Sequence, residues 1–349
     1  MKLLYLPNES ALDNKRMQIG ARKAFQKLLE KGELSELEIF SYIFETKQHG
    51  LEASKGKIIQ LVEQFQPNII FWQHVEHFDI TEDFIGKIKN TASKPKLVYH
   101  EADPYTRHIK KINGNMKIMF RNSDAVFMVG IGIFAELARE AGAKRVYFSP
   151  HNFDNIRSGT DWTPTLQREN DLVMIANAMG YVRIPGRYFP GSQHRKELGK
   201  KLSKLFRKRF ALYGKGWQGL EASRGQLPFD QQENAIRSAW VSINWDHFDE
   251  VPFYFSNRLP ISLAAGVPHI TSWHPGYDII FKECKGGLYT AKTVDEAVEI
   301  AQYLLSQPKE FLIEEGQKGK DFVFKHLEAD IVYSNIIKKV KEIFFSSNA

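Results

Sequence analysis

The sequence has very little cysteine: of its 349 residues only Cys284 is one. An intramolecular disulfide therefore cannot form, and the fold has to be held together by buried apolar surface. A chain of this length is most simply divided into two domains, each large enough to bury its own core. Such low cysteine usage is typical of a reducing compartment, so we expect a cytoplasmic protein.

Long apolar runs are also missing. The best candidate, residues 125–135, is rich in glycine, is followed at once by Glu136, and falls well short of the roughly 18 to 20 residues that a spanning helix needs. The first ten residues reach Pro7 without the apolar core of a secretory signal peptide. We expect neither a membrane span nor a leader.

A strong excess of one charge is absent too, because 48 Lys and Arg stand against 41 Asp and Glu, a formal net charge of +7. The even distribution argues against nucleic-acid binding. One basic stretch, residues 194–210, has Leu198, Leu202 and Leu205 at helical spacing. It predicts an amphipathic helix with a solvated basic face, and the alternative is peripheral contact with an anionic membrane, on the inner membrane face.

Several motifs that carry chemistry are not present. The sequence contains no G-x-x-x-x-G-K-[ST] phosphate loop, no G-x-S-x-G serine elbow and no Asp-x-Asp pair for a metal-bound diphosphate. His74 and His77 follow a predicted strand at a spacing that does not bring both rings to one side. We expect no metal site, and we interpret Cys284 as an ordinary thiol.

What the sequence does contain is an alternation of short β-branched or aromatic runs with longer amphipathic segments. This predicts an α/β fold of two Rossmann-like, doubly wound domains that face a cleft. The expected parts are a first domain over 1–150, a linker over 151–170, a second domain over 171–325 and a last helix within 326–349. The pattern also predicts a strand over 37–44 and helices over 11–31 and 107–120.

One dinucleotide-like motif follows a predicted strand. Gly130, Gly132 and Ala135 form G-x-G-x-x-A at the start of a helix. The Rossmann fingerprint belongs to the first strand-helix turn, whereas this one follows the fifth strand. An NAD-dependent oxidoreductase is therefore kept only as an alternative, and close packing of helix on strand is the simpler interpretation.

The most informative stretch is residues 251–281. Arg258, preceded by Asn257, opens a short helix whose small residues allow tight packing under the next strand. A helix N-terminus with a guanidinium fork can bind a diphosphate. Residues 273–277, ending in Tyr277, form a loop at the carboxyl end of that strand, where a base or sugar can be held.

The order of motifs in the second half resembles the group 1 glycosyltransferases of the GT-B fold, and within them the spore-protein-like cytoplasmic branch. The matching segments are LVMIAN ending at Asn177, Arg195 opening the basic helix, LYGKGW over 212–217, SINW with Asn244, and NRLPISLAAG over 257–266. The resemblance covers about residues 170–340 and implies that the last helix crosses back to the first domain. It also implies polysaccharide biosynthesis as a setting.

One position departs from the family pattern. The glutamate that grips the donor ribose in relatives is replaced by Ile261, and Phe253 stands where the first of the paired glutamates of retaining members would fall. Asp249, Glu250 or Asp278 are the possible substitutes. Retention or inversion therefore stays open, and so does a catalytically inert relative that only binds a nucleotide sugar or glycan.

Sugar transfer requires stabilisation of the leaving nucleoside diphosphate. For this role we select Gly214 and Lys215, in a loop where glycine permits close approach, together with Asn257 and Arg258. Tyr277 and Asp278 complete the expected donor contacts. The expected donor is a nucleotide sugar, a UDP-sugar being one candidate, with no further cofactor and no metal.

The acceptor hydroxyl has to be positioned and, in an inverting enzyme, deprotonated. The segment KLVYHEADPY places His100 and Asp103 at the carboxyl end of a predicted strand, which Pro104 ends. We therefore predict Asp103 or His100 as the catalytic base of a metal-independent transferase acting on a glycan, a lipid-linked molecule or another acceptor.

Overall fold

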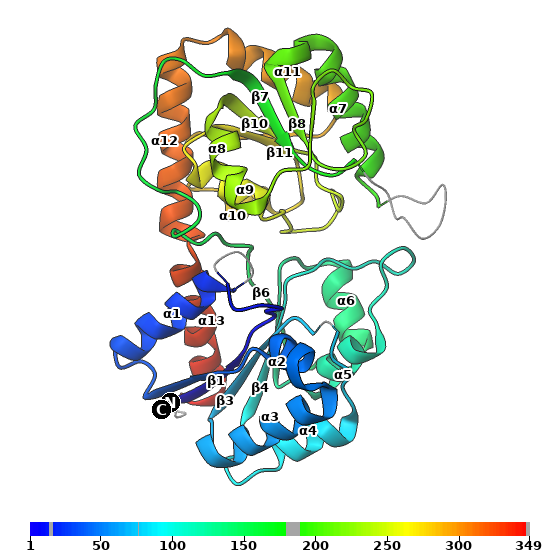
Figure 1. The fold of residues 1–349 in the computed structure, drawn as a ribbon, viewed down its shortest axis with the longest axis vertical. Coiled ribbons are helices and arrows are strands. Elements are labelled where there is room, and N and C mark those ends of the chain that lie inside the picture. Colours follow the sequence, from blue (N-terminus) through cyan, green and yellow to red (C-terminus); the bar gives the residue numbers. More distant parts are fainter. Residues whose placement is uncertain (14–16, 76, 179–188, 347–349) are drawn as a thin grey trace. The chain divides into compact units, whose positions relative to one another are not determined.

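The computed structural model describes residues 1–13, 17–75, 77–178 and 189–346. The chain divides into two compact units, Met1–Pro150 with Ala329–Ala349 and, between these segments, His151–Glu328. Each unit contains one six-stranded sheet in which all neighbouring strands are parallel (Figure 1). This confirms the predicted fold class of two doubly wound, Rossmann-like α/β units.

The first unit has the strand order β2-β1-β3-β4-β5-β6. The central strands are buried on both faces, as is usual in parallel sheets, whereas the edge strands are partly exposed. Its strands are β1 (Lys2–Leu6), β2 (Glu36–Ile39), β3 (Ile69–Gln73), β4 (Lys96–Glu101), β5 (Ala125–Met128) and β6 (Val146–Phe148). Its helices are α1 (Ile19–Glu30), α2 (Tyr42–His49), α3 (Leu51–Phe65), α4 (Glu82–Lys89), α5 (Gly114–Asn122), α6 (Ile133–Glu140) and α13 (Ala329–Phe344).

Helix α13 belongs to the first unit although it ends the chain. It packs along α1 (Figure 1), and its buried side chains Val332, Ile336 and Val340 join the cluster that contains Phe25. The apolar positions recur every three or four residues, which places them on one face of the helix. The core of the first unit is therefore completed by a segment more than three hundred residues from β1.

The second unit has the strand order β12-β11-β10-β7-β8-β9. Its strands are β7 (Asn170–Ile175), β8 (Phe210–Tyr213), β9 (Ser223–Gly225), β10 (Ala239–Ile243), β11 (His269–Ser272) and β12 (Leu288–Ala291). Its helices are α7 (Ser192–Phe206), α8 (Gln232–Arg237), α9 (Arg258–Ala264), α10 (Tyr277–Ile280), α11 (Val294–Ser306) and α12 (Lys309–His326), with short 3-10 turns at Arg207–Arg209 and Phe229–Gln231.

Several element boundaries differ from the sequence-based expectation. The strand expected over 37–44 ends at Ile39, and α2 begins at Tyr42. The helix expected over 107–120 begins only at Gly114, because the Asn113 side chain caps it by accepting from the Met116 N–H at 2.9 Å. Of the helix expected over 11–31, the structure shows Ile19–Glu30, and residues 14–16 lie outside the described part.

The segment before β7, expected to be a linker, packs within the second unit. Phe153 is buried and its backbone pairs with Glu328 in an isolated β-bridge. Glu233 of α8 accepts hydrogen bonds from the backbone of Gly159 and Thr160 at 2.6 and 3.1 Å. These contacts tie the segment to the same core as the sheet.

Candidate active site

The second sheet has a topological switch point between β7 and β10. Strands β8 and β9 lie on one side of β7, and β10 to β12 lie on the other. All of these strands are parallel, so their carboxyl ends share one edge of the sheet. Open α/β sheets bind ligands at this edge, beside the switch point.

Three cationic residues meet at the carboxyl end of β7. The Arg258 Nε donates to the Ile175 carbonyl at 2.6 Å, and the Arg195 Nη1 donates to the Asn177 carbonyl at 3.2 Å. The backbone N–H of Lys215 donates to Asn177 Oδ1 at 2.8 Å. Within the described ranges none of the three cations forms an ion pair with a carboxylate. The edge therefore carries positive charge that an anionic ligand can neutralise.

Arg195 is buried and holds this edge in place. Its Nε donates to the Trp245 carbonyl at 2.5 Å, and Nη1 lies 2.7 Å from His247 Nε2. Burial, together with the positive charge of Arg258, lowers the pKa of Arg195 to about 9. Burial and the charge of Arg195 lower the pKa of His247 to about 2, so His247 is neutral at physiological pH and accepts from Arg195.

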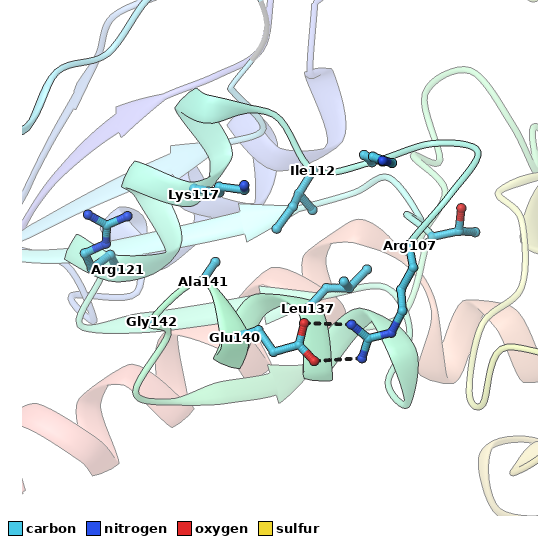
Figure 2. Close-up of a pocket in the computed structure, with 10 residues that line it drawn as sticks. Arg107, Ile112, Lys117, Arg121, Leu137, Glu140, Ala141 and Gly142 are labelled. Carbon is cyan, nitrogen blue, oxygen red and sulfur yellow. Dashed lines mark hydrogen bonds and ion pairs between the residues drawn. The ribbon is translucent and has the colours of Figure 1, made fainter.

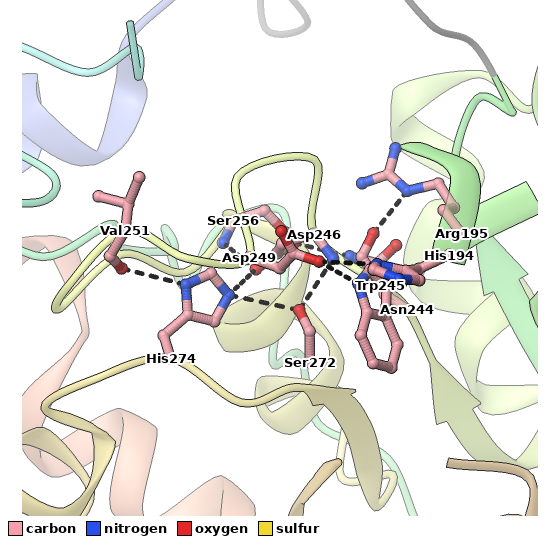
Figure 3. Close-up of polar contacts among 10 residues, drawn as sticks. All are labelled: His194, Arg195, Asn244, Trp245, Asp246, Asp249, Val251, Ser256, Ser272 and His274. Atoms are coloured by element: carbon pink, nitrogen blue, oxygen red, sulfur yellow. Dashed lines mark hydrogen bonds and ion pairs between the residues drawn. The ribbon is translucent and has the colours of Figure 1, made fainter. Parts of the chain in front are cut away.

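A buried carboxylate lies beneath the cations (Figure 3). Asp246 accepts from Asn244 Nδ2 at 2.9 Å and from the Ser256 N–H at 3.2 Å, and it lies 3.4 Å from His274 Nε2. Burial opposes ionisation, but the hydrogen bond and charge of His274 outweigh it and hold the pKa of Asp246 well below its usual range. This carboxylate fixes the turn after β10 to the loop before α9.

Gly214 lets the loop after β8 approach the end of β7 closely. Its φ is 128°, and a Cβ atom placed there would lie 2.2 Å from the Ala176 carbonyl oxygen. Any side chain would push the backbone of Lys215 away from Asn177. The glycine therefore sets the position of Lys215, whose side chain is exposed.

The other predicted donor residues are distributed differently. Asn257 directly precedes α9 and is exposed, and Asp278 is exposed on α10. Tyr277 is 3% exposed, and its ring stacks on His274 with centroids 5.0 Å apart. Burial raises the pKa of Tyr277 well above its usual range. The structure thus brings Gly214, Lys215 and Arg258 together but places Tyr277 in the core.

At the position of the missing family glutamate, Ile261 is buried in α9 and packs in the apolar cluster of the second unit. Of the substitutes considered, Asp249 accepts from Trp245 Nε1 at 2.7 Å and lies 3.2 Å from His194 Nδ1. Its carboxylate is therefore engaged in holding the loop after β10. Glu250 is exposed next to it.

The first unit has a polar cluster at the carboxyl edge of its own sheet, where β3 and β4 end. Glu101 is fully buried and accepts from the Tyr99 hydroxyl at 2.5 Å and from the Asp103 N–H at 3.0 Å. His74 Nδ1 lies 2.6 Å from Glu101. His74 also has a φ of 40°, a left-handed conformation that is unfavourable for histidine and that clusters at functional sites.

The two predicted bases lie next to this pair. His100 is 2% exposed, and its ring packs against Phe71 and Tyr333. Asp103 is partly exposed, with Lys110 Nζ 2.5 Å from its carboxylate. Of the two, Asp103 is the one that a ligand can reach.

The sequence did not predict the polar residues whose role depends on a hydrogen bond or ion pair with another side chain. Asp246 and the pair of Glu101 and His74 are single polar side chains just beyond strands, and neither forms a recognisable spacing motif. Arg195 was visible only as the first cation of the basic helix. The signal that finds Asp246 and Glu101 is their position at the ends of β10 and β4, on the ligand-binding edge.

A known protein family matches part of the chain. A family described as glycosyl transferase-like matches residues 194–337, from α7 into α13. No curated protein matches the sequence significantly.

Solved structures share the fold across both units. A sucrose-phosphate synthase from Thermosynechococcus elongatus has a TM-score of 0.63 and 11% identity, over 99% of this chain and 100% of that one. HepE from Anabaena, solved with UDP and glucose, has a TM-score of 0.58 and 11% identity, over 98% and 99%. AviGT4, a glycosyltransferase involved in avilamycin A biosynthesis, has a TM-score of 0.57 and 10% identity, over 99% and 98%.

The fold is therefore that of the two-domain GT-B glycosyltransferases, as the motif order had indicated. Within this fold, residues 194–337 are similar to the glycosyl transferase-like family. The described residues contain no group of three or more His, Cys, Asp or Glu side chains placed to hold a metal ion. Nor does any described helix combine the length and apolar character needed to cross a bilayer.

Proposed function

We propose that the chain transfers a sugar from a UDP-sugar to a hydroxyl of a glycan or lipid-linked acceptor without a metal ion. The observation that carries the proposal is the unneutralised charge of Lys215 and Arg258 at the switch point of the second sheet. A diphosphate supplies the matching negative charge. HepE, which has the same fold, was solved with UDP and glucose, and this supports a uridine nucleotide.

In this proposal Arg258 and Lys215 stabilise the diphosphate as it leaves the sugar, replacing the charge that a metal would supply. Arg195 does not touch the ligand. It holds the end of β7 and the turn after β10, so that Arg258 and Lys215 need not reorganise during the reaction. The exposed Asn257 and Asp278 are placed on the same donor side.

The acceptor side is assigned to the first unit, with Asp103 as the proposed base. A second candidate is His74, because the buried Glu101 2.6 Å away fixes the tautomer and orientation of its ring. This arrangement of a histidine and a buried carboxylate is the one used by general bases. The substitutions described below decide whether the Asp103 carboxylate or the His74 imidazole takes the proton of the acceptor hydroxyl.

A thermal-shift series with UDP, GDP, ADP, CMP and NAD tests the donor assignment. A ligand that binds only the native state raises the melting temperature by mass action. We expect UDP to give the largest shift, and a shift by NAD alone would favour the oxidoreductase alternative. Release of UDP from a panel of UDP-sugars then separates an enzyme from an inert relative, which would bind UDP without turnover.

We also propose that α7 contacts anionic membrane surfaces. Lys196, Lys200 and Lys204 are exposed at four-residue spacing on one side of the helix, and the neighbouring Leu205 is 49% exposed. A cationic row beside an apolar side chain fits the interface of an anionic bilayer. Co-sedimentation with vesicles containing anionic phospholipid should be lost when the three lysines are replaced by glutamine, and retention of binding would contradict the assignment.

A further inference from the structure

A basic pocket lies in the first unit, beside the loop that follows β4. It is bounded by the loop 106–112 and by α5 and α6 (Figure 2), and its volume is about 560 Å³. Its lining includes four cations and an apolar floor: Arg107, Lys111, Lys117 and Arg121, with Ile112 and Leu137. Ligand pockets commonly enclose roughly 300 to 1000 Å³, so the space suffices for a substrate-sized group.

Two of the four cations are already neutralised. Arg107 donates to both carboxylate oxygens of Glu140, at 2.8 and 2.7 Å (Figure 2), and this contact lowers the pKa of Glu140. Arg121 Nη1 lies 2.9 Å from Glu82. These pairs shape the pocket wall but supply little net charge.

Lys111 and Lys117 carry the uncompensated charge. Both are exposed, and neither side chain forms an ion pair or hydrogen bond with a residue in the described part of the chain. Lys117 lies in the first turn of α5, and Figure 2 shows its ammonium group at the side of the pocket where Ile112 lies. The pocket therefore presents two free ammonium groups beside an apolar surface.

The apolar side chains that line the pocket lie next to these two lysines. Leu137 is 7% exposed and Ile112 is partly exposed, so both present carbon atoms to the pocket. Gly142 closes the far end with a φ of 104°, and a Cβ atom there would come within 3.0 Å of the Arg121 side chain. A ligand that fits this lining needs an anionic group attached to an apolar or amphipathic body.

The loop that forms one wall starts at the candidate acceptor site. It leaves β4 just after Glu101, and the contact between Lys110 and Asp103 ties it to the carboxyl edge of the sheet. The hydroxyl of Thr106 accepts from the Ile109 N–H at 3.1 Å and holds the loop in a tight turn. An acceptor can therefore be contacted by one loop at both its reacting end and its anionic end.

From these observations we infer that the basic pocket binds a phosphoryl group carried by an amphipathic acceptor, with Lys111 and Lys117 as its partners. The inference rests on the proposed transferase function, since it assigns the substrate class of the same acceptor site. The apolar body next to the phosphoryl group contacts Ile112 and Leu137. A phosphate-linked lipid or alkyl carrier has this chemistry.

Binding of octyl phosphate to the full chain tests the inference directly. Calorimetry is done below the micelle concentration and without nucleotide sugar, with octyl glucoside and inorganic phosphate as comparison ligands. We expect octyl phosphate to bind at least about tenfold more tightly than either, because only it offers both the charge and the apolar tail. Equal affinity for inorganic phosphate, or for octyl glucoside, would overturn the inference.

The double substitution Lys111→Gln and Lys117→Gln should weaken octyl phosphate binding roughly tenfold or more, the loss expected for removing charge-assisted hydrogen bonds. The matched control, Lys31→Gln with Lys338→Gln, removes two exposed lysines elsewhere in the first unit and should leave the affinity within about twofold. Thermal melting verifies that both variants are folded. An unchanged affinity for octyl phosphate in the Lys111 and Lys117 variant would contradict the assignment of these lysines to the pocket.

Three further outcomes distinguish the possible sources of the phosphoryl group and separate the two proposals. If anionic vesicles bind through Lys111 and Lys117 while monomeric octyl phosphate does not, the pocket binds the headgroup of a bilayer lipid and the acceptor assignment is wrong. If octyl phosphate binds as expected but no UDP-sugar is turned over, only the proposed function fails. If transfer proceeds equally well in the Lys111 and Lys117 variant, only the pocket assignment fails.

Discussion

Replacing Arg258 with alanine removes the half-buried guanidinium at the switch point and nothing else that touches the sheet edge. In the proposed complex it loses one charge-assisted contact to the donor diphosphate, worth about 1.5 to 3 kcal/mol. UDP should therefore bind roughly 10 to 150 times more weakly. Arg258→Lys keeps the charge but loses the fork and should recover part of the affinity.

The same substitution should cost little stability. The bond from Arg258 Nε to the Ile175 carbonyl is lost, a net contribution of about 1 kcal/mol. Against this, the charge of Arg258 is, after burial, the main cause that lowers the pKa of Arg195, so its removal relieves the repulsion between the two guanidinium groups in the free protein. We expect the two effects to offset each other to within about 1 kcal/mol.

Calorimetric titration with UDP measures the effect, and urea unfolding measures the stability. Arg237→Ala is the matched control, because Arg237 ends α8 just before β10 and so lies at the opposite edge of the same sheet. It should leave UDP affinity within about twofold. If Arg258→Ala binds UDP as tightly as the parent while remaining folded, the diphosphate does not lie at the end of β7 and the donor assignment is refuted.

Three further predictions concern pH, metal and the base. Burial lowers the pKa of His247 to about 2 and of His269 to about 4, whereas both titrate near 6.5 when unfolded, so the unfolded chain gains protons first on acidification. The free energy of unfolding, measured with urea, should be highest above pH 6.5 and should fall by about 2 to 4 kcal/mol between pH 7 and 5. His269→Asn should remove about half of that fall. An unaltered pH profile in this variant would contradict the assignment of the fall to the buried histidines. Transfer should survive EDTA, and activity lost on chelation and restored by Mg²⁺ or Mn²⁺ would falsify metal independence. If Asp103 is the base, Asp103→Asn should slow transfer roughly 100- to 10,000-fold and leave the donor affinity within about 0.5 kcal/mol. A full rate for Asp103→Asn together with a slow rate for Glu101→Gln would assign the role of base to His74 and its partner Glu101. Weak donor binding by Asp103→Asn would place the nucleotide in the first unit.

The architecture could be predicted from the sequence because its signal is repeated many times. Each buried strand is a short β-branched or aromatic run, and each helix has apolar residues at intervals of three or four. The edge proposed to bind the donor could be located for the same reason: Gly214, Lys215 and Arg258 follow or precede elements whose positions the pattern already predicts. Boundaries that depend on one cap, such as Asn113 before α5, were missed because periodicity continues through them.

The parts of the site that escaped prediction depend on contacts between distant segments. Asp246 acquires its role from His274, which reaches it from the loop after β11. Glu101 acquires its role from His74, which was considered only as half of a metal pair with His77. Tyr277 was predicted to face the ligand, but stacking on His274 turns its ring into the core. No local pattern encodes such pairs.

The position of α13 in the first unit has a consequence for how the protein is made. The second unit, residues 151–328, is contiguous in sequence, so all of its strands and helices are synthesised before α13. The first unit must wait, because Phe25 and its neighbours stay uncovered until Val332, Ile336 and Val340 arrive. Domains usually mature from the N-terminus during translation. Here the order should be inverted, with the later-synthesised unit reaching its native state first and the earlier one remaining incomplete until α13 follows.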